Sequence, residues 1–419
     1  MVINFLNRPS VPSDLRRVHR ALVLRHIFFA PRGSRAQLAR ETGLSGMAIT
    51  RIIRELIDAG LIEEAGKSNR KGNPGRRQTN LRICPSGGFV IGVVISAFGH
   101  EAALFSATGK ALARREMSFE SIQTAHEAIE VASSTILAII QDVNIDASRV
   151  LGIAIAIAAF VRTGTGTVTS APYLGWQQVE LGRGISDRTN IPVVVENIAD
   201  AINMAEQAKG AAVGFRDVFL AHQSVTCGAS YSHEGKLVRG ANFSAGQIGH
   251  LTVGESSLVC SCGDTRCFNC HASGWSVLAH LERIDSRCFE AGKIKSYAMA
   301  LARLVREDPK RGTPEGDALF HAGHQWGRTM QEVALIVDPQ AIVLAGKMSE
   351  ATAYVDGCES AWQNAPDKHG YKPPKLIVGQ VPAIQAAGYL ALDSFLYSPQ
   401  LDLDGLISDG TSTRRGGMR

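Results

Sequence analysis

SRAQLARETGLSGMAITRIIRELIDAGLIEEAG, residues 34–66, carries the clearest structural signal in the chain. Ser34 followed by Gln37 is a capping-box pattern, so a helix is expected to start there. It should end at Gly43, which tolerates a left-handed backbone, and Ser45 can cap a second helix. The apolar residues of that second helix recur as on one buried face: Ile49, Ile52, Ile53, Leu56 and Ile57. Two short helices joined by a tight glycine turn predict a helix-turn-helix.

The flanking residues extend this unit to a winged helix-turn-helix. A helix is expected over 14–30, and two strand-like runs, 61–65 and 79–84, enclose a basic loop that contains glycine and proline. The start of a recognition helix meets base edges, and a charged hairpin tip suits phosphate or minor-groove contact. The expected DNA-binding residues are Ser45, Gly46, Met47, Thr50, Arg51 and Arg54 on the helix, and Arg70, Lys71, Arg76 and Arg77 on the wing. The alternative is a helical surface module with a solvated charged loop.

Length and composition indicate a soluble protein of several domains. The chain has 419 residues, 45% of them hydrophobic and 20% charged, which is too long for one core. No apolar run reaches the roughly 18 to 20 residues that span a bilayer, and the N-terminus has no signal-peptide pattern. We therefore expect a cytoplasmic protein, in which clustered cysteines favour a metal over disulfides.

Strand and helix patterns alternate along the rest of the chain, through two successive halves. GGFVIGVVISAFGHEAALFSATGKAL predicts a strand, a turn and a second strand, and a helix is expected over about 124–142. VLGIAIAIAAFV and IPVVVEN are further buried strands, and AIVLAGKM and KLIVGQV follow a helical region. This order predicts an α/β body with two lobes and a cleft between them.

The whole chain resembles the ROK family, which contains sugar-responsive repressors and sugar kinases. The resemblance rests on segments in family order, among them GRRQTNLRI, IPVVVEN, GKLVRGANFSAGQIGH, CSCGDTRC and DPQAIVLAG. It implies an actin-like (sugar kinase or ribonuclease H-like) body behind the winged helix-turn-helix. The expected parts are the DNA-binding head, 1–84; a first lobe, 85–205, rejoined by a C-terminal helix at about 384–398; a second lobe with a zinc site, 206–383; and a disordered tail, 399–419.

Four residues have the spacing of a metal site. His250, Cys260, Cys262 and Cys267 follow the pattern H-x9-C-x-C-x4-C, which is also the zinc motif of the family that the chain resembles. Three sulfurs and one imidazole nitrogen make a closed tetrahedral shell, so Zn²⁺ would be structural. A disulfide pair and a catalytic thiol are the alternatives. Cys270 lies close enough to substitute as a ligand but falls outside the family pattern.

Three kinase features of the family are altered. In the first phosphate loop, the positions of aspartate, glycine and threonine hold Val94, Ser96 and Phe98. The second loop, from Ser224, lacks most of its glycines. The Asn-Asp-Ala-Asn motif reads Asn-Ile-Ala-Asp over 197–200, so the catalytic base becomes isoleucine. The aspartate at its end lies roughly 200° further around a helix and should not take that place. We therefore expect no kinase activity and no catalytic residue.

The sugar pocket implied by the resemblance is altered as well. Two family glutamates become Gln247 and Asn269, while Asn197 and His250 remain, and these four residues are the expected effector ligands. Amides donate and accept hydrogen bonds, so hydroxyl recognition would survive. Because three acidic positions are lost, this pocket should repel a phosphorylated or acidic sugar less than a kinase pocket would. The alternative is a pocket that has lost its ligand binding and has only a structural role.

The sequence thus predicts a DNA-binding transcriptional regulator, a repressor of carbohydrate-related genes whose body senses a sugar-like effector. The expected partners are operator DNA, further copies of the chain as a dimer or tetramer, and a sugar or polyol. Two alternatives remain: an active sugar kinase with a DNA-binding head, and a DNA-binding protein whose body only forms oligomers.

Overall fold

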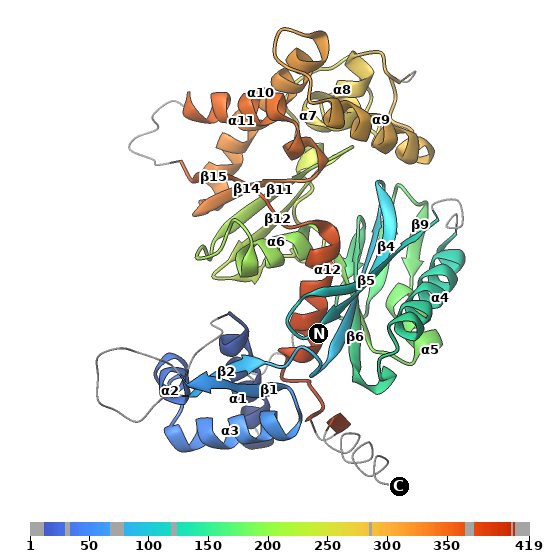
Figure 1. Ribbon diagram of the computed structural model, residues 1–419. Coiled ribbons are helices and arrows are strands. Elements are labelled where there is room, and N and C mark those ends of the chain that lie inside the picture. Colours follow the sequence, from blue (N-terminus) through green and yellow to red (C-terminus); the bar gives the residue numbers. More distant parts are fainter. Residues whose placement is uncertain are drawn as a thin grey trace.

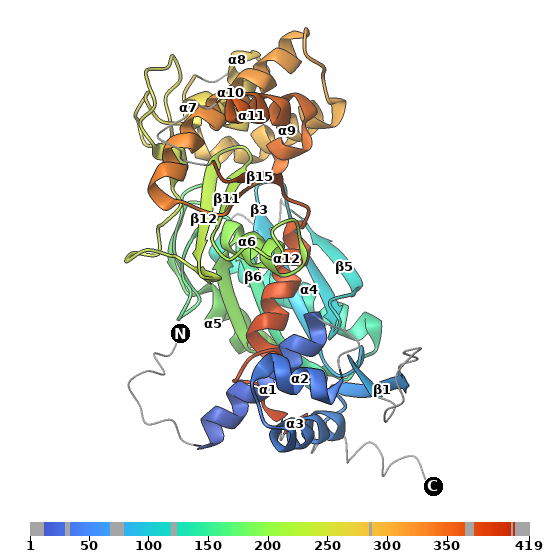
Figure 2. The same ribbon diagram turned by 90° about the vertical axis from the view of Figure 1, so that its left-hand side faces the viewer.

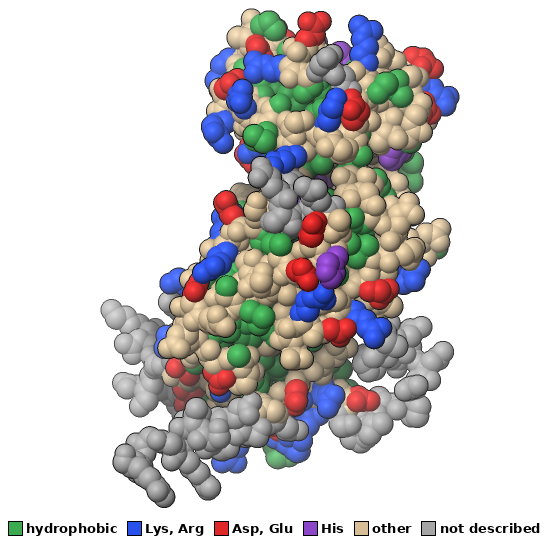
Figure 3. Space-filling view, turned by 90° about the vertical axis from the view of Figure 1, so that its right-hand side faces the viewer, with side chains coloured by type: hydrophobic (Ala, Val, Ile, Leu, Met, Phe, Trp, Pro, Cys, Tyr) green, Lys and Arg blue, Asp and Glu red, His purple; other side chains and the backbone are tan. Residues whose placement is uncertain are grey.

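The structure, a computed structural model, describes residues 12–29, 34–67, 79–118, 124–284, 287–364, 373–403 and 405–406. The head lies at one end of the molecule and is followed by two lobes (Figure 1). The outline narrows where the second lobe meets the first (Figure 3). None of the described helices is long and apolar enough to cross a membrane.

The head is a winged helix-turn-helix, as predicted. Its elements are α1 (Pro12–Phe29), α2 (Arg35–Thr42), α3 (Gly46–Asp58), and the antiparallel strands β1 (Ile62–Lys67) and β2 (Thr79–Ile83). The Ser34 side chain accepts a hydrogen bond from the Gln37 amide, and α2 ends at Gly43 with φ +71°. Ser45 caps α3 by accepting from the amide of Ala48. Of the side chains expected to face the core of the head, Ile49, Ile52, Ile53 and Leu56 are buried on α3, and Ile57 is partly buried against the same cluster.

The first lobe is built on a five-stranded sheet in the order β10-β6-β3-β4-β5. Its strands are β3 (Phe89–Ser96), β4 (Gly99–Ser106), β5 (Ala111–Met117), β6 (Val150–Ile157) and β10 (Val193–Asn197). Ile91 and Val93 pack on the side of α4 (Ala125–Val143), and Val90 and Val94 pack on the opposite side. Because both faces are covered, β3 reads as a continuous apolar run rather than an alternating one. Helix α5 (Leu181–Thr189) and a small sheet of β7 (Phe160–Arg162), β8 (Thr167–Ala171) and β9 (Trp176–Val179) complete the lobe.

The second lobe has its own five-stranded sheet, in the order β13-β12-β11-β14-β15. Its strands are β11 (Val218–Gln223), β12 (Cys227–His233), β13 (Lys236–Leu237), β14 (Ala341–Ala345) and β15 (Lys375–Val378). On the side away from the first lobe lie α7 (Asn269–Ala272), α8 (Gly274–His280), α9 (Ile294–Glu307), α10 (Pro314–Val337) and α11 (Thr352–Gln363) (Figure 1).

Two helices lie between the sheets. Helix α6 (Ile198–Lys209) follows β10 and packs on β11 and β12, while α12 (Ala383–Ala391) packs on α6, β3 and β6. Both ribbon views show α12 running from the second lobe to the head (Figures 1 and 2). It continues as a π-helix, Leu392–Leu396.

The last described residues depart from the expected disordered tail. Leu403 and Leu406 are buried in the same core cluster as α12. The chain therefore remains packed beyond residue 399, because these two leucines lie against apolar residues of that cluster. The remainder of the expected tail, 407–419, lies outside the described residues.

Candidate functional site

The recognition helix α3 presents the expected DNA-facing side chains to solvent. Met47, at its start, is 87% exposed. The Thr50 hydroxyl donates to the Gly46 carbonyl at 2.8 Å, and Arg54 is exposed. Arg51 forms an ion pair with Glu55 at 3.3 Å. The wing residues Arg70, Lys71, Arg76 and Arg77 lie outside the described residues.

Glu55 connects the recognition helix to the first helix of the head. Its carboxylate also accepts two hydrogen bonds from the Arg16 guanidinium of α1. The Arg51 side chain is 69% exposed, so the pair with Glu55 orients the guanidinium without removing it from solvent. An exposed ion pair of this kind contributes little to stability and is easily exchanged for a stronger partner.

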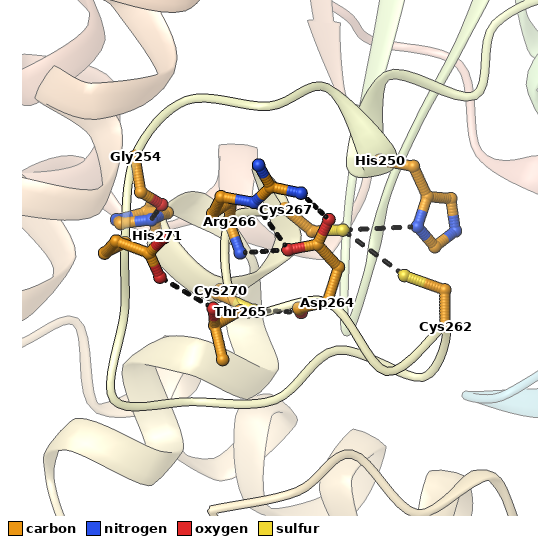
Figure 4. A network of polar contacts seen from close by, with 10 residues as sticks. His250, Gly254, Cys262, Asp264, Thr265, Arg266, Cys267, Cys270 and His271 are labelled. Atoms are coloured by element: carbon orange, nitrogen blue, oxygen red, sulfur yellow. Dashed lines mark hydrogen bonds and ion pairs between the residues drawn. The ribbon is translucent and has the colours of Figure 1, made fainter.

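His250, Cys260, Cys262 and Cys267 come together in the second lobe, with their ligand atoms all within 4.8 Å of one another. The sulfurs of Cys262 and Cys267 are 3.4 Å apart, and the Nδ1 atom of His250 lies 3.7 Å from the Cys267 sulfur (Figure 4). Nδ1 also lies 3.7 Å from the Cys260 sulfur. A tetrahedral zinc shell has ligand separations of about 3.5 to 3.8 Å, so the donor set and its dimensions fit a structural metal. All eight cysteines are free thiols, and the Cys262–Cys267 distance is far longer than a disulfide bond.

Cys270 lies beside this cluster, not in it. Its side chain is completely buried and is not one of the four grouped ligands. A hydrogen bond from Cys270 is the main cause that lowers the pKa of the Cys260 thiol to about 2. Cys270 therefore supports a thiolate at Cys260 without taking its place.

The four expected effector residues border one cavity of about 470 Å³ next to the metal cluster. Asn197 caps α6 by accepting from the Ala199 amide and donates to the Ala159 carbonyl, each at 2.8 Å. The Gln247 side chain donates to the Ser244 carbonyl at 3.3 Å. Because Nδ1 of His250 faces the sulfurs, Nε2 is the ring nitrogen left for a ligand.

The side chain of Asn269 already makes two hydrogen bonds within the protein, which the sequence does not indicate. Its oxygen accepts from the Cys227 amide at 2.8 Å, and its nitrogen donates to the Cys260 sulfur at 3.8 Å. The side chain is almost fully buried. Asn269 therefore ties β12 to the metal cluster while it lines the cavity.

Asp200 borders the same cavity, although its position two residues beyond Ile198 on a helix predicted that it would point elsewhere. The helix α6 meets the cavity end-on, so residues on opposite sides of its first turn all reach the wall. The Ser230 hydroxyl donates to Asp200 at 2.5 Å. Burial, and then the neighbouring Glu196 carboxylate, raise the pKa of Asp200 to about 7.

Arg239 also lines the cavity, and sequence reasoning missed it because its partner is 43 positions away. Two of its N–H groups, at Nε and Nη2, donate to one oxygen of Glu196 at 3.1 and 2.6 Å. The Glu196 side chain is only 5% exposed. The pair links β10 of the first lobe to the loop after β13 of the second.

A larger cleft, of about 980 Å³, separates the lobes on the other side of Ile198. Val94, Ser96 and Phe98, the residues predicted at the first phosphate loop, form part of its wall. Among the described residues that line it, the lysines and arginines are Arg114, which pairs with Glu101, and Lys347, which pairs with Glu350 at 2.5 Å.

The chain is similar to known proteins over both of its parts. Residues 90–378 match the sequence profile of the ROK family, and residues 23–63 match that of the winged helix-turn-helix DNA-binding group. The xylose repressor of Caldicellulosiruptor bescii is 23% identical over 338 residues, which is 80% of this chain and 84% of that protein.

Two crystal structures share the fold. A ROK family transcriptional regulator, a homologue of the E. coli MLC protein, superposes with a TM-score of 0.77 and 21% identity, over 94% of this chain and 100% of that one. A ROK family glucokinase from Streptomyces griseus, in complex with glucose and AMPPNP, gives a TM-score of 0.60 and 22% identity, over 73% of this chain and 100% of that one.

Proposed function

The chain belongs to the ROK family, and on that premise we propose that it is a DNA-binding transcriptional regulator that represses carbohydrate-related genes in response to a sugar-like effector. The observation that carries the proposal is the union, in one chain, of a winged helix-turn-helix with an exposed recognition helix and a ROK body with a cavity. A relative named as a xylose repressor matches 80% of this chain. The glucokinase structure matches only 73% of this chain.

The recognition helix α3 supplies sequence specificity in this proposal. Arg51 and Arg54 can reach guanine edges, while Met47 can contact thymine methyl groups. The wing residues Arg70, Lys71, Arg76 and Arg77 would add phosphate or minor-groove contacts. Winged heads commonly read two half-sites about one helical turn apart, so the operator-bound form would be a dimer or a tetramer.

The body lacks kinase activity in this proposal. The base position holds Ile198, which cannot accept a proton from a sugar hydroxyl. The first phosphate loop expected from the family is altered as well, with Val94, Ser96 and Phe98 in the cleft wall at the positions of aspartate, glycine and threonine. A coupled assay of ATP hydrolysis with glucose or xylose should therefore give no turnover above background.

Zn²⁺ is the metal that we propose for His250 and the three cysteines. Thiolate and imidazole ligands in a closed tetrahedral shell leave no open position, so the ion would hold the loop and not catalyse. The cluster includes His250 and lies against Asn269, and both residues line the effector cavity. Bound zinc would thereby fix the shape of that wall.

Helix α6 offers a route from the cavity to the head. Asn197 caps the end that faces the cavity, and near the other end Lys209 lies with its Nζ atom 3.4 Å from the centre of the Phe28 ring of α1. A ligand that favours one position of α6 would therefore change the contact between α6 and helix α1 of the head.

A second set of contacts joins the head to the end of α12. Arg25 pairs with Asp393 at 2.7 Å, and the Phe28 and Tyr397 rings are 4.6 Å apart. The π-helix between α12 and Tyr397 lies at this junction.

Selection of bound fragments from a random DNA pool tests the proposed function. A regulator should enrich a defined motif, with two related half-sites if the chain binds as a dimer. Recovery of DNA without any shared motif, at an affinity that depends only on salt, would contradict it.

A further inference from the structure

Asp200, Glu196 and Arg239 form a charged group at the cavity, and none of the three was among the expected ligands. Arg239 is the only lysine or arginine among the described residues that line this cavity. Two of its N–H groups are committed to Glu196, whose side chain is almost fully buried. The positive charge is thus neutralised within the protein.

Among the described residues of the cavity wall, the remaining ionisable groups offer no second cation. Burial lowers the pKa of His222 to about 4, so this imidazole is neutral near pH 7. His250 directs Nδ1 to the sulfurs of Cys260 and Cys267. An anionic ligand would have to leave water without gaining a counter-charge, which is costly in a partly buried site.

Asp200 has the chemistry of a hydroxyl ligand. One of its oxygens accepts from Ser230, which fixes the carboxyl group against β12 and leaves acceptor capacity on the group. If Asp200 is ionised, its negative charge repels a nearby anionic ligand. If Asp200 is protonated, it is neutral, and the anionic ligand still has no cation to pair with.

We infer that the effector is a neutral, hydroxyl-rich molecule, a free sugar or polyol, and that Asp200 binds its hydroxyl groups and selects against phosphorylated and acidic sugars. This inference rests on the proposed function, because it takes the cavity to be the effector site. Asp200 thereby supplies an acidic group two positions from the one that Ile198 has replaced.

Calorimetric titration with matched ligands tests the selectivity of the unmodified protein. D-Glucose is compared with glucose 6-phosphate and glucuronate, and D-xylose and xylitol extend the neutral set. At least one neutral member should bind about tenfold more tightly than its anionic counterpart. Equal or tighter binding of the anion would overturn the inference, whatever the variants do.

Asp200→Ala tests the residue itself. The variant should lose about tenfold or more of its affinity for the neutral ligand. Asp187→Ala, an exposed aspartate on α5, is the matched control and should leave this affinity unchanged. Unchanged sugar affinity in Asp200→Ala would overturn the inference.

Glu196→Gln provides a gain of function that a damaged protein would not show. The change leaves the charge of Arg239 without its counter-ion, so the ratio of glucose 6-phosphate affinity to glucose affinity should rise about tenfold. An unchanged ratio would show that Arg239 does not govern charge selection. If sugars bind without this charge selection, only the inference about Asp200 fails. If no sugar binds the wild-type chain while operator binding is intact, the sugar-sensing role in the proposed function fails as well.

Discussion

Glu206→Gln should loosen the connection between the effector cavity and the head. Glu206 lies on α6 with its side chain completely buried. One carboxylate oxygen accepts from the amides of Gln380 and Val381, just before α12, at 2.5 and 2.6 Å. The other accepts from the Ala211 amide at 2.7 Å. The side chain therefore joins α6 to the start of α12.

The size of the effect follows from these three bonds. Glutamine retains one oxygen for Gln380 and Val381, but its NH₂ group must face the Ala211 amide, donor against donor. A hydrogen bond to a charged group contributes about 1.5 to 3 kcal/mol, and a buried donor without a partner costs about 1 to 3 kcal/mol. With partial relaxation we expect the local stability to fall by about 2 to 4 kcal/mol.

Hydrogen exchange followed by mass spectrometry measures this change where it occurs. Protection of the amides at Gln380 and Val381 should fall by about 30- to 1,000-fold, since each 1.4 kcal/mol is a factor of ten. Glu359→Gln, the same change on the exposed side of α11, should leave this segment as it is. The sugar response of operator affinity should weaken only in Glu206→Gln. Protection within about twofold of wild type at Gln380 and Val381 would refute the reasoning.

Three further outcomes are expected. Arg51→Ala should cost about 1 to 3 kcal/mol of operator binding and relax base preference in gel-shift titrations, and wild-type binding would mean that α3 is not the reading helix. Cys262→Ser should lower zinc content by elemental analysis and also lower the melting temperature, whereas an unchanged melting curve would show that the metal does not support the fold. Because the pKa of Asp200 is raised to about 7, the native state keeps a proton between about pH 4 and 7 that the unfolded chain has lost. This group's contribution to the free energy of unfolding is therefore fully present below about pH 4 and is lost as the pH rises through about 7. Asp200→Asn should flatten that part of the stability profile, and an identical slope in both proteins would contradict the shift.

Local rules accounted for most of the head and for the metal cluster. Ser34, Gly43 and Ser45 act through neighbours a few positions away, so their spacing alone predicts three helix boundaries: the start and the end of α2 and the start of α3. The cysteines likewise lie on one loop with His250, and their spacing limits how they can meet.

The missed features depend on contacts between distant segments. Arg239 pairs with Glu196 across 43 positions, and Glu206 reaches Gln380 across 174. Asp200 was placed away from the site because helix periodicity describes the side of a helix and not its end. Only the direction in which α6 meets the cavity reveals that Asp200 borders it.

Fluorescence anisotropy of a labelled operator, selected beforehand from a random pool, tests the central claim most directly. Titration of the chain in the absence of sugar should give tight binding that an unrelated DNA of equal length does not match. Addition of a neutral sugar that binds the cavity should shift the operator dissociation constant by about tenfold or more, and the shift should disappear in Asp200→Ala. If a sugar saturates the protein and operator affinity stays the same, the chain is not a sugar-responsive regulator.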